Sequence, residues 1–256
     1  MNVLFLGTSA GWPLPRLGCQ CPICQSQDSR DKRLRPAVLV NETILIDAGP
    51  DIYHQLTNLK VDTRKIKALI LTHAHLDHIL GFNDLTHLYN REEKILKLIS
   101  TQSVFNGLRQ FHRLPLSPFK PQLVAANETI ELLKNTKIAL FPVEHSQMPC
   151  FGVKMKADRL FVYIPDLKRI PKTKRKNVRG VDLLVLDGSS LDRRGQTKTH
   201  QSIEEGIRLA KDLKPKRVYF THIGHITGTH EELENFVQKN GGKNFHIAYD
   251  GLNLNF

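Results

Sequence analysis

The stretch Leu71-Thr72-His73-Ala74-His75-Leu76-Asp77-His78 places three imidazoles and one carboxylate within six residues. Ala68-Leu69-Ile70-Leu71, just before them, is a continuous apolar run typical of a strand buried on both faces. We therefore predict that the polar cluster lies in a loop at the carboxyl end of a strand, where rigid scaffolds present reactive groups. Four ligand-type side chains this close together indicate a site for metal ions.

The spacing divides these four side chains between two positions. His73 and His75 are two residues apart and can point the same way from an extended segment, whereas Asp77 and His78 are adjacent and can face a neighbouring position. One ion cannot easily take all four ligands from so short a peptide, but two ions about 3.5 to 4 Å apart can. A run of solvated histidines in a surface turn is the alternative interpretation, and the position after a strand disfavours it.

The H-x-H-x-D-H pattern resembles the signature of the metallo-β-lactamase fold hydrolases. This resemblance implies three further ligands downstream, each isolated and each at a strand end. His145, Asp166 and His222 each follow an apolar run in the expected order, although any one of them alone would also suit an ordinary loop residue. The resemblance implies one metal bound by His73, His75 and His145, a second bound by Asp77, His78 and His222, and Asp166 bridging the two.

The order of apolar and helical segments predicts an α/β fold. Strands in two runs, with helices between and outside them, are consistent with two packed sheets between helical layers. The resemblance implies the four-layer αββα sandwich itself. We expect strands near 2–7, 37–47, 68–71, 95–99, 136–143, 152–163, 182–187, 217–221 and 245–249, and helices near 51–59, 81–89, 101–113 and 202–213.

Length and composition are ordinary for a globular enzyme. The chain has 256 residues, of which 40% are hydrophobic and 24% are charged, and we expect one hydrolase domain over 1–256. No apolar run approaches the roughly 20 residues that a membrane-spanning helix needs. The first residues lack the basic and apolar regions of a signal peptide. These features predict a cytoplasmic protein without a membrane partner.

Three of the four cysteines form the pattern Cys19-Gln20-Cys21-Pro22-Ile23-Cys24. This C-x-C-x-x-C spacing suits three corners of a tetrahedral zinc site, and His225 is the preferred fourth ligand. With His225, the cluster resembles the structural zinc site of the phosphoribosyl cyclic phosphate phosphodiesterases of phosphonate breakdown. We expect a structural zinc loop near 9–36; a redox cluster or unliganded thiols are the alternatives.

Two further residues are expected to act on the metal site. Asp47, in Asp47-Ala48-Gly49, resembles the family's aspartate that supports a ligand histidine, or it caps a turn. His200 precedes a predicted helix start and resembles the histidine that the cyclic phosphodiesterases and the tRNA 3′-end nucleases aim into the site. Such a histidine can protonate a leaving alkoxide or steady a phosphate oxygen, and the helix start offers N–H donors for the phosphoryl group. We predict a catalytic role for His200, and one for Asp77 besides ligation; a solvent-facing loop histidine is the alternative for His200.

The net charge makes the choice of substrate less simple. A formal net charge of +12 attracts polyanions, and a dense basic run over 168–179 starts two residues after Asp166. That run is expected either near the mouth of the site or on a solvated face. RNA is therefore the rival partner, although no long glycine-rich insertion resembles the arm of many tRNA 3′-end nucleases. The cysteine cluster with His225 favours a small substrate.

Three functions remain open at this point. The first is a dinuclear metal-dependent phosphodiesterase that uses a metal-bridged hydroxide on a small or cyclic sugar phosphodiester. The second is a tRNA 3′-processing endoribonuclease of the same fold, and the third is a non-catalytic binding or carrier protein. Imidazole and carboxylate ligands suit zinc, manganese or iron. A homodimer is a further expectation for the assembly.

Several remaining residues are predicted to have no part in the chemistry. Asp187 ends a buried-looking strand; a turn aspartate is the preferred interpretation, and a residue that supports the site is the alternative. Cys150 is predicted to be a small packed side chain. Trp12 is a candidate for the pocket entrance without support from spacing. The histidines without ligand spacing are expected on the surface or on a helix face: His54, His87, His112, His230 and His246.

Overall fold

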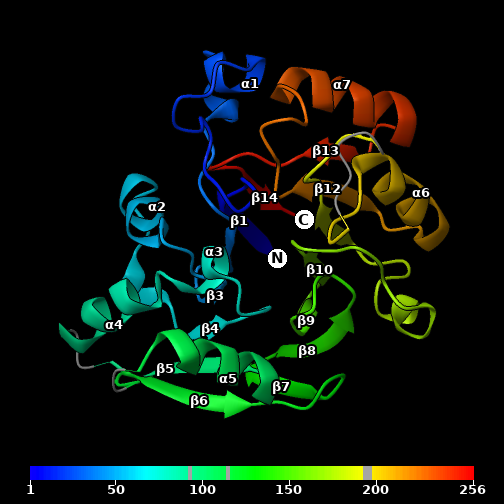
Figure 1. Cartoon of the computed structure of the whole chain (residues 1–256). Coiled ribbons are helices and arrows are strands. Elements are labelled where there is room, and N and C mark those ends of the chain that lie inside the picture. Colours follow the sequence, from blue (N-terminus) through cyan, green and yellow to red (C-terminus); the bar gives the residue numbers. More distant parts are fainter. Residues whose placement is uncertain (92–93, 114–115, 193–197) are drawn as a thin grey trace.

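A computed structural model describes residues 1–91, 94–113, 116–192 and 198–256 (Figure 1). Within these residues, the strands form two seven-stranded sheets. The first sheet has the order β14 (Asn253–Asn255), β1 (Asn2–Gly7), β2 (Ala37–Val40), β3 (Ile44–Ile46), β4 (Ala68–Ile70), β5 (Leu96–Ser100) and β6 (Phe119–Leu123). The second has the order β13 (Phe245–Ile247), β12 (Arg217–Thr221), β11 (Leu183–Asp187), β10 (Leu160–Ile164), β9 (Cys150–Lys156), β8 (Thr136–Val143) and β7 (Thr129–Leu133).

Helices lie on the outer sides of the two sheets, as Figure 1 shows. Near the first sheet are α2 (Ile52–Asn58), α3 (Leu76–Ile79), α4 (Phe82–Arg91) and α5 (Gln102–Phe111). Near the second sheet are α6 (Ile203–Leu213) and α7 (His230–Gly241), while the short α1 (Pro22–Gln25) lies in the irregular N-terminal segment. Among the described residues there are also three 3-10 turns, η1 (Ser29–Asp31), η2 (Thr63–Lys65) and η3 (Lys172–Asn177). The predicted αββα sandwich is confirmed.

The apolar core has two layers, and β11 contributes to both of them. Leu183 and Val185 pack in the layer between the two sheets, whereas Leu184 and Leu186 pack between the second sheet and its helices. All four side chains are buried. A strand covered on both faces needs no polar residues, and this explains the continuous apolar run in the sequence.

Strand direction gathers the predicted site at one edge of the sheets. β3 and β4 run parallel in the first sheet, as do β10, β11 and β12 in the second. Carboxyl ends of parallel strands meet at one edge. The motif 73–78 follows β4, Asp166 follows β10 and His222 follows β12, so residues distant in sequence are brought to the same place.

Some predicted elements need correction. The stretch 152–163 is not one strand, because β9 and β10 form an antiparallel hairpin whose turn is closed by a hydrogen bond from the Ala157 N–H to the Arg159 carbonyl, 3.0 Å. The stretch 37–47 likewise contains two strands, β2 and β3, which pair antiparallel as a hairpin. Strands β6, β7 and β14 and helix α7 were not predicted.

Candidate metal centre

The first predicted metal set is brought together by the fold. His73 Nε2 lies 3.0 Å from His75 Nδ1, and His145 Nε2 lies 3.2 Å from the same atom. Burial lowers the pKa of all three imidazoles, which keeps them neutral as metal ligation requires. Each residue offers one ligand atom, and with Asp166 these atoms lie within 4.8 Å of one another, so the set can hold a metal ion.

The second predicted set is also brought together. Asp77 Oδ2 lies 3.4 Å from His78 Nε2 and 3.7 Å from His222 Nε2. His78 and His222 are buried, and the ligand atoms of all three residues lie within 4.8 Å of one another. This set therefore has the composition and the spacing for a second ion.

Asp166 lies between the two sets. Its Oδ2 is 2.9 Å from His78 Nε2, and its Oδ1 is 3.5 Å from His145 Nε2 and 3.3 Å from His222 Nε2. One carboxylate thus reaches ligands of both sets. Its position agrees with the bridging role that the resemblance implies.

The polar atoms of this cluster are poorly satisfied by the protein itself. Both ring nitrogens of His222 are buried without a hydrogen-bond partner, and His78 Nε2 and Asp166 Oδ2, although 2.9 Å apart, are not oriented for a hydrogen bond with each other or with any other group. Buried polar atoms usually have partners, since leaving one unpaired costs about 1–3 kcal/mol. His222 also has φ 61°, a left-handed backbone in which histidine occurs more often than most other side chains. The unpaired buried nitrogens and carboxylate oxygen fit divalent cations.

Partners outside the cluster orient the ligand histidines. His78 Nδ1 lies 2.8 Å from Asp47 Oδ2, and because a carboxylate only accepts, Nδ1 carries the proton and Nε2 faces the cluster. His145 Nδ1 donates to the Thr199 carbonyl at 2.9 Å in the same way. Asp47 also accepts hydrogen bonds from the Thr72 N–H and hydroxyl. The support predicted for Asp47 is therefore present in the structure, and it orients His78.

His200 lies against ligands of both sets. Its ring stacks on His222 with centroids 5.0 Å apart and meets His145 edge-on at 4.6 Å. Asp187 Oδ2 accepts a hydrogen bond from His200 Nδ1 at 2.6 Å. Burial alone would lower the pKa of His200, but the charge and hydrogen bond of Asp187, with the charge of Asp166, raise it to about 9. The loop histidine is thus held at the cluster.

Asp187 has both of the roles that the sequence left open for it. It is fully buried and, besides His200, it accepts hydrogen bonds from the Leu167 and Ser189 N–H groups at 2.9 Å each. The bond from Ser189, two residues on, is that of the preferred turn aspartate, and the contact with His200 is the support that was the second interpretation. A signal was present in the sequence: a carboxylate directly after four buried apolar residues at the end of β11.

The N–H donors at the start of α6 are already engaged, contrary to prediction. The Ile203 N–H donates to the Ser190 carbonyl at 2.8 Å, and the Glu204 N–H donates to the Leu191 carbonyl at 3.2 Å. A capping box joins Ser202 and Glu205. The helix start therefore stabilises the loop that carries His200 and leaves no obvious donor for a phosphoryl group.

The cysteine cluster is formed, but the His225 imidazole lies outside it. The sulfurs of Cys19, Cys21 and Cys24 lie within 4.8 Å of one another. The His225 Nδ1 lies 3.1 Å from Nη1 of Arg16, and only its carbonyl reaches the Cys21 sulfur, at 3.5 Å. Three corners of the predicted zinc site are thus in place. The fourth is not assembled as predicted, because the guanidinium of Arg16 is the partner of the imidazole.

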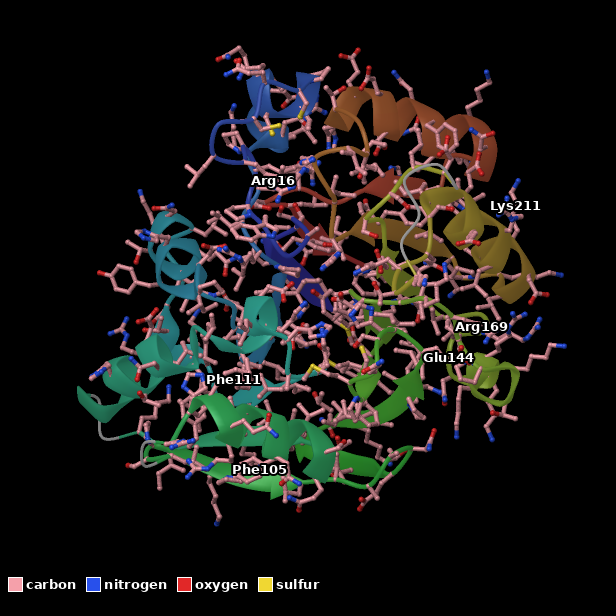
Figure 2. The ribbon with its side chains drawn as sticks, in the orientation of Figure 1. Arg16, Phe105, Phe111, Glu144, Arg169 and Lys211 are labelled. Atoms are coloured by element: carbon pink, nitrogen blue, oxygen red, sulfur yellow. The ribbon has the colours of Figure 1, made fainter. Side chains whose placement is uncertain are left out.

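The start of the basic run lies beside His200. The ammonium of Lys168 donates to the His200 carbonyl at 3.0 Å. A cavity of about 500 Å³ is lined there by Lys168, Arg169, Arg175 and Arg208, among others. Arg169 pairs with Glu144 at 2.7 Å (Figure 2). The run therefore borders the candidate site, and some of its charge is already neutralised.

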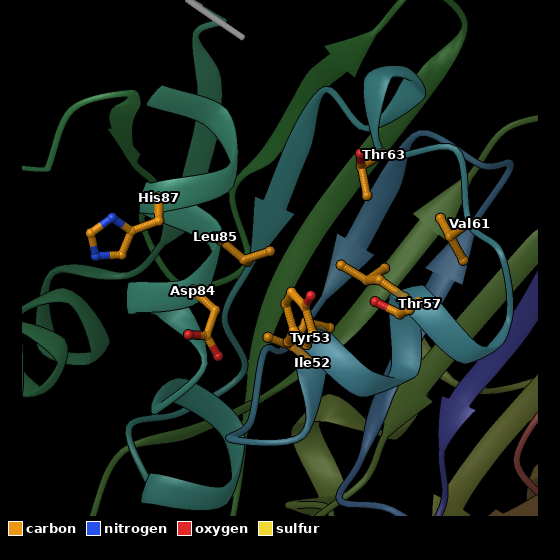
Figure 3. Close-up of a pocket in the computed structure, with 9 residues that line it drawn as sticks. Ile52, Tyr53, Thr57, Val61, Thr63, Asp84, Leu85 and His87 are labelled. Atoms are coloured by element: carbon orange, nitrogen blue, oxygen red, sulfur yellow. The ribbon is translucent and has the colours of Figure 1, made fainter. Parts of the chain in front are cut away.

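Another cavity, of about 570 Å³, lies between α2 and α4 (Figure 3). Ile52 and Tyr53 line it from α2, and Asp84 and His87 from α4. No predicted metal ligand is among the residues that line it. The larger of these two cavities is therefore not the one that adjoins the loop of His200.

Two of the residues expected to have no chemical role differ in their surroundings. Cys150 is a packed, buried side chain, as predicted. His230 was predicted on the surface or on a helix face; it is the first residue of α7 and is buried, with its Nδ1 accepting a hydrogen bond from the Arg33 guanidinium at 3.1 Å. In the described part of the chain, no helix has the length and apolar character to cross a membrane.

Comparisons with known proteins agree with this geometry. Residues 42–223 match the family model described as "Beta-lactamase superfamily domain". The octanoyltransferase of Porphyromonas gingivalis is 28% identical over 272 residues, covering 98% of this chain and 51% of that protein. The chain thus spans about half the length of that relative. The coenzyme PQQ synthesis protein B of Methylorubrum extorquens is 25% identical over 302 residues, covering 99% of each.

Solved structures show the same fold. A diphosphatase from the PhnP family has a TM-score of 0.87 and 30% identity, covering 100% of this chain and 97% of that one. Human tRNase Z, short form (ELAC1), has a TM-score of 0.73 and 18% identity, covering 100% and 99%; at this identity the likeness concerns the fold alone. The match of the family model, together with the metal-ligand sets at the sheet edge, shows that the chain belongs to the metallo-β-lactamase superfamily.

Proposed function

We propose that this protein is a dinuclear metal-dependent phosphodiesterase that acts on a small or cyclic sugar phosphodiester. The observation that carries the proposal is the placement of His200, which Asp187 holds against one ligand of each metal set. A thioester hydrolase has little need of a proton donor at the metals, because its thiolate leaving group is stable without a proton. Phosphodiester cleavage does need one, because it expels an alkoxide. Lactam hydrolysis needs one as well, so the preference for phosphorus over lactams rests on the similarity to the diphosphatase of the PhnP family.

The proposed roles divide between the ligand sets and His200. His73, His75 and His145 would hold one divalent ion, zinc or manganese, and Asp77, His78 and His222 the other, with Asp166 between them. Such ions supply Lewis acidity and activate water near neutral pH. The Cys19, Cys21 and Cys24 thiols would hold a structural zinc, with His225 as the fourth ligand after the imidazole turns from Arg16.

The residues of the chain then perform the proton transfer. Asp187 fixes the tautomer and orientation of His200 through Nδ1, so that the proton to be given to the leaving oxygen resides on Nε2. Stacking on His222 limits tilting of the ring. Asp47 holds His78 with Nε2 directed inward. The similarity to a diphosphatase of the PhnP family at 30% identity supports chemistry at phosphorus.

The decisive experiment combines metal analysis with a leaving-group comparison. His200→Ala should lose about 10²-fold or more in kcat on an alkyl phosphodiester and much less on a bis-aryl phosphate, whose leaving group needs no proton. His54→Ala, an exposed histidine on α2, is the matched control. Equal losses on both substrates would refute the leaving-group role. Absence of any phosphodiester turnover by the metal-loaded protein would favour a binding or carrier protein.

RNA is the second candidate substrate, and one observation favours it. The cavity lined by Lys168, Arg169, Arg175 and Arg208 adjoins the loop of His200. Cleavage of a precursor tRNA with a strong loss on Arg175→Ala and Arg208→Ala, and poor turnover of cyclic sugar phosphates, would favour the endoribonuclease. The reverse pattern would favour the small substrate.

A further inference from the structure

Trp12 is exposed directly beside the candidate metal centre. It is 64% exposed, although tryptophan is the largest apolar side chain. Its neighbour Gly11 abuts a predicted ligand, because a Cβ at Gly11 would lie 3.5 Å from Asp77 Oδ2. From this contact and standard backbone geometry, the Trp12 Cα lies at most about 9 Å from the Asp77 carboxylate. Trp12 therefore stands at the rim of the site.

The backbone that carries Trp12 is held at several points. The Ala10 N–H donates to the Ile223 carbonyl at 3.0 Å, and the Arg35 guanidinium donates to the Gly11 carbonyl at 3.0 Å. The Ser9 hydroxyl donates to the carbonyl of Trp12 itself. A segment tied in this way presents its side chain in a defined place, so the exposed ring is not simply the tip of a loose loop.

The Arg16 guanidinium lies over the indole, and apolar side chains are exposed on neighbouring segments. The guanidinium carbon of Arg16, labelled in Figure 2, lies 5.5 Å from the centre of the Trp12 ring. Ile226 is 66% exposed and Leu76, between two predicted ligands, is 43% exposed. The pairing of Ser9 with Ile223 brings the segment of Trp12 beside that of Ile226. A planar, apolar and electron-rich group would find complementary contacts here.

We propose that Trp12 is a stacking platform for the nucleobase of a nucleotide phosphodiester, which makes it a specificity-determining residue. This inference rests on the proposed function, since a phosphodiester at the metal ions would carry its substituent towards the rim. An aliphatic substituent would be served equally by a leucine at this position. A rigid indole adds a π face, which a planar base uses fully, and every base can stack on it.

The single tryptophan of the chain makes a direct binding test available. Titration of the metal-loaded enzyme with a cyclic mononucleotide should quench the tryptophan fluorescence, whereas a cyclic sugar phosphate without a base should not. Free N-acetyltryptophanamide controls for light absorption by the base. Equal responses to the two ligands would overturn the proposal.

Kinetics on the same pair of substrates provide the second test. Trp12→Ala should raise KM for the cyclic nucleotide about tenfold and leave KM for the substrate without a base unchanged, while Trp12→Phe keeps most of the affinity. Leu17→Ala removes another exposed apolar side chain of the same segment and serves as the matched control. An equal rise in KM on both substrates would show a merely structural role and overturn the proposal.

The two proposals fail in different ways. If no phosphodiester is turned over but nucleotides still quench the fluorescence, the proposed function fails and the platform stands. If phosphodiesters are turned over without quenching and without a base-dependent KM effect, the platform fails alone. A short oligoribonucleotide that quenches at lower concentration than the mononucleotide would identify RNA as the source of the base, and the opposite order would identify a small nucleotide.

Discussion

Asp47→Asn should weaken one of the two metal positions selectively. The asparagine has the same shape and tolerates the left-handed backbone at this position, φ 61°. If its amide oxygen keeps the hydrogen bond from the Thr72 N–H, its NH2 group faces His78 Nδ1. That nitrogen must then accept, and the proton moves to Nε2, the atom that faces the predicted second metal.

The size of the effect follows from the loss of a lone pair at Nε2. Removing a partner that orients a ligand typically costs 10–100-fold in metal affinity, or about 1.4–2.7 kcal/mol. The set of His73, His75 and His145 depends on Asp47 only through Thr72, whose hydroxyl lies 3.0 Å from His73 Nδ1 and donates to Asp47. Its affinity should therefore fall less than that of the second set. Competition with a chromophoric chelator, followed by counting of zinc equivalents, measures the two affinities separately.

The control is Asp182→Asn, because Asp182 also accepts a backbone hydrogen bond, from the Leu160 N–H at 2.8 Å, but lies outside the predicted ligand sets. It should lower stability without changing either metal affinity. An equal loss of metal affinity at both positions in Asp47→Asn, or no loss at either, would refute the proposed change of the His78 tautomer.

Three further perturbations test other parts of the structure. Gly49→Ala should lower the thermal midpoint and the metal content together, because its Cβ would lie 2.0 Å from the Asp77 carbonyl oxygen; a normal metal content in a destabilised variant would contradict this. Burial, with the charge of Arg33, lowers the pKa of His230 to about 4 from an ordinary 6.5. As the pH falls, this histidine is therefore protonated in the unfolded chain before it is protonated in the folded one. The free energy of unfolding should fall as the pH drops from about 6.5 to 4. Urea midpoints of the parent protein and His230→Gln check this, and parallel pH curves would contradict it. Cys21→Ser should remove one metal equivalent and lower stability more than it lowers the turnover of the folded enzyme; near-normal stability after loss of that metal would count against a structural role.

Most of the metal ligands could be predicted because they follow strands buried on both faces; His145 follows β8, which is only partly buried. Strands buried on both faces appear in the sequence as unbroken apolar runs, and Asp166 and His222 are the first ligand-type residues after their runs. Three of the four edge strands of the described sheets, β6, β7 and β14, could not be predicted in this way. β6 contains Pro121 and exposed polar residues, and β14 consists of Asn253, Leu254 and Asn255, since an edge strand pairs on one side and is solvated on the other.

Contacts between distant segments explain what else the sequence left open. Asp187 and His200 are thirteen residues apart, and only the fold shows that the carboxylate holds the imidazole. The partner of His225 is Arg16, more than two hundred residues earlier in the chain. The start of α7 is different, because the capping box of Thr229 and Glu232 is local and was readable from the sequence.

The division of the predicted ligands between the two sheets has a mechanical consequence. Residues 73–78 belong to the first sheet, and His145, Asp166 and His222 belong to the second, so each ion would join the two layers. A bound ion therefore adds its binding free energy to the cohesion of the sandwich. Conversely, a substitution in the core between the sheets that shifts one sheet against the other moves the ligands of the first sheet away from those of the second. Metal affinity should therefore respond to changes in packing far from the metal centre.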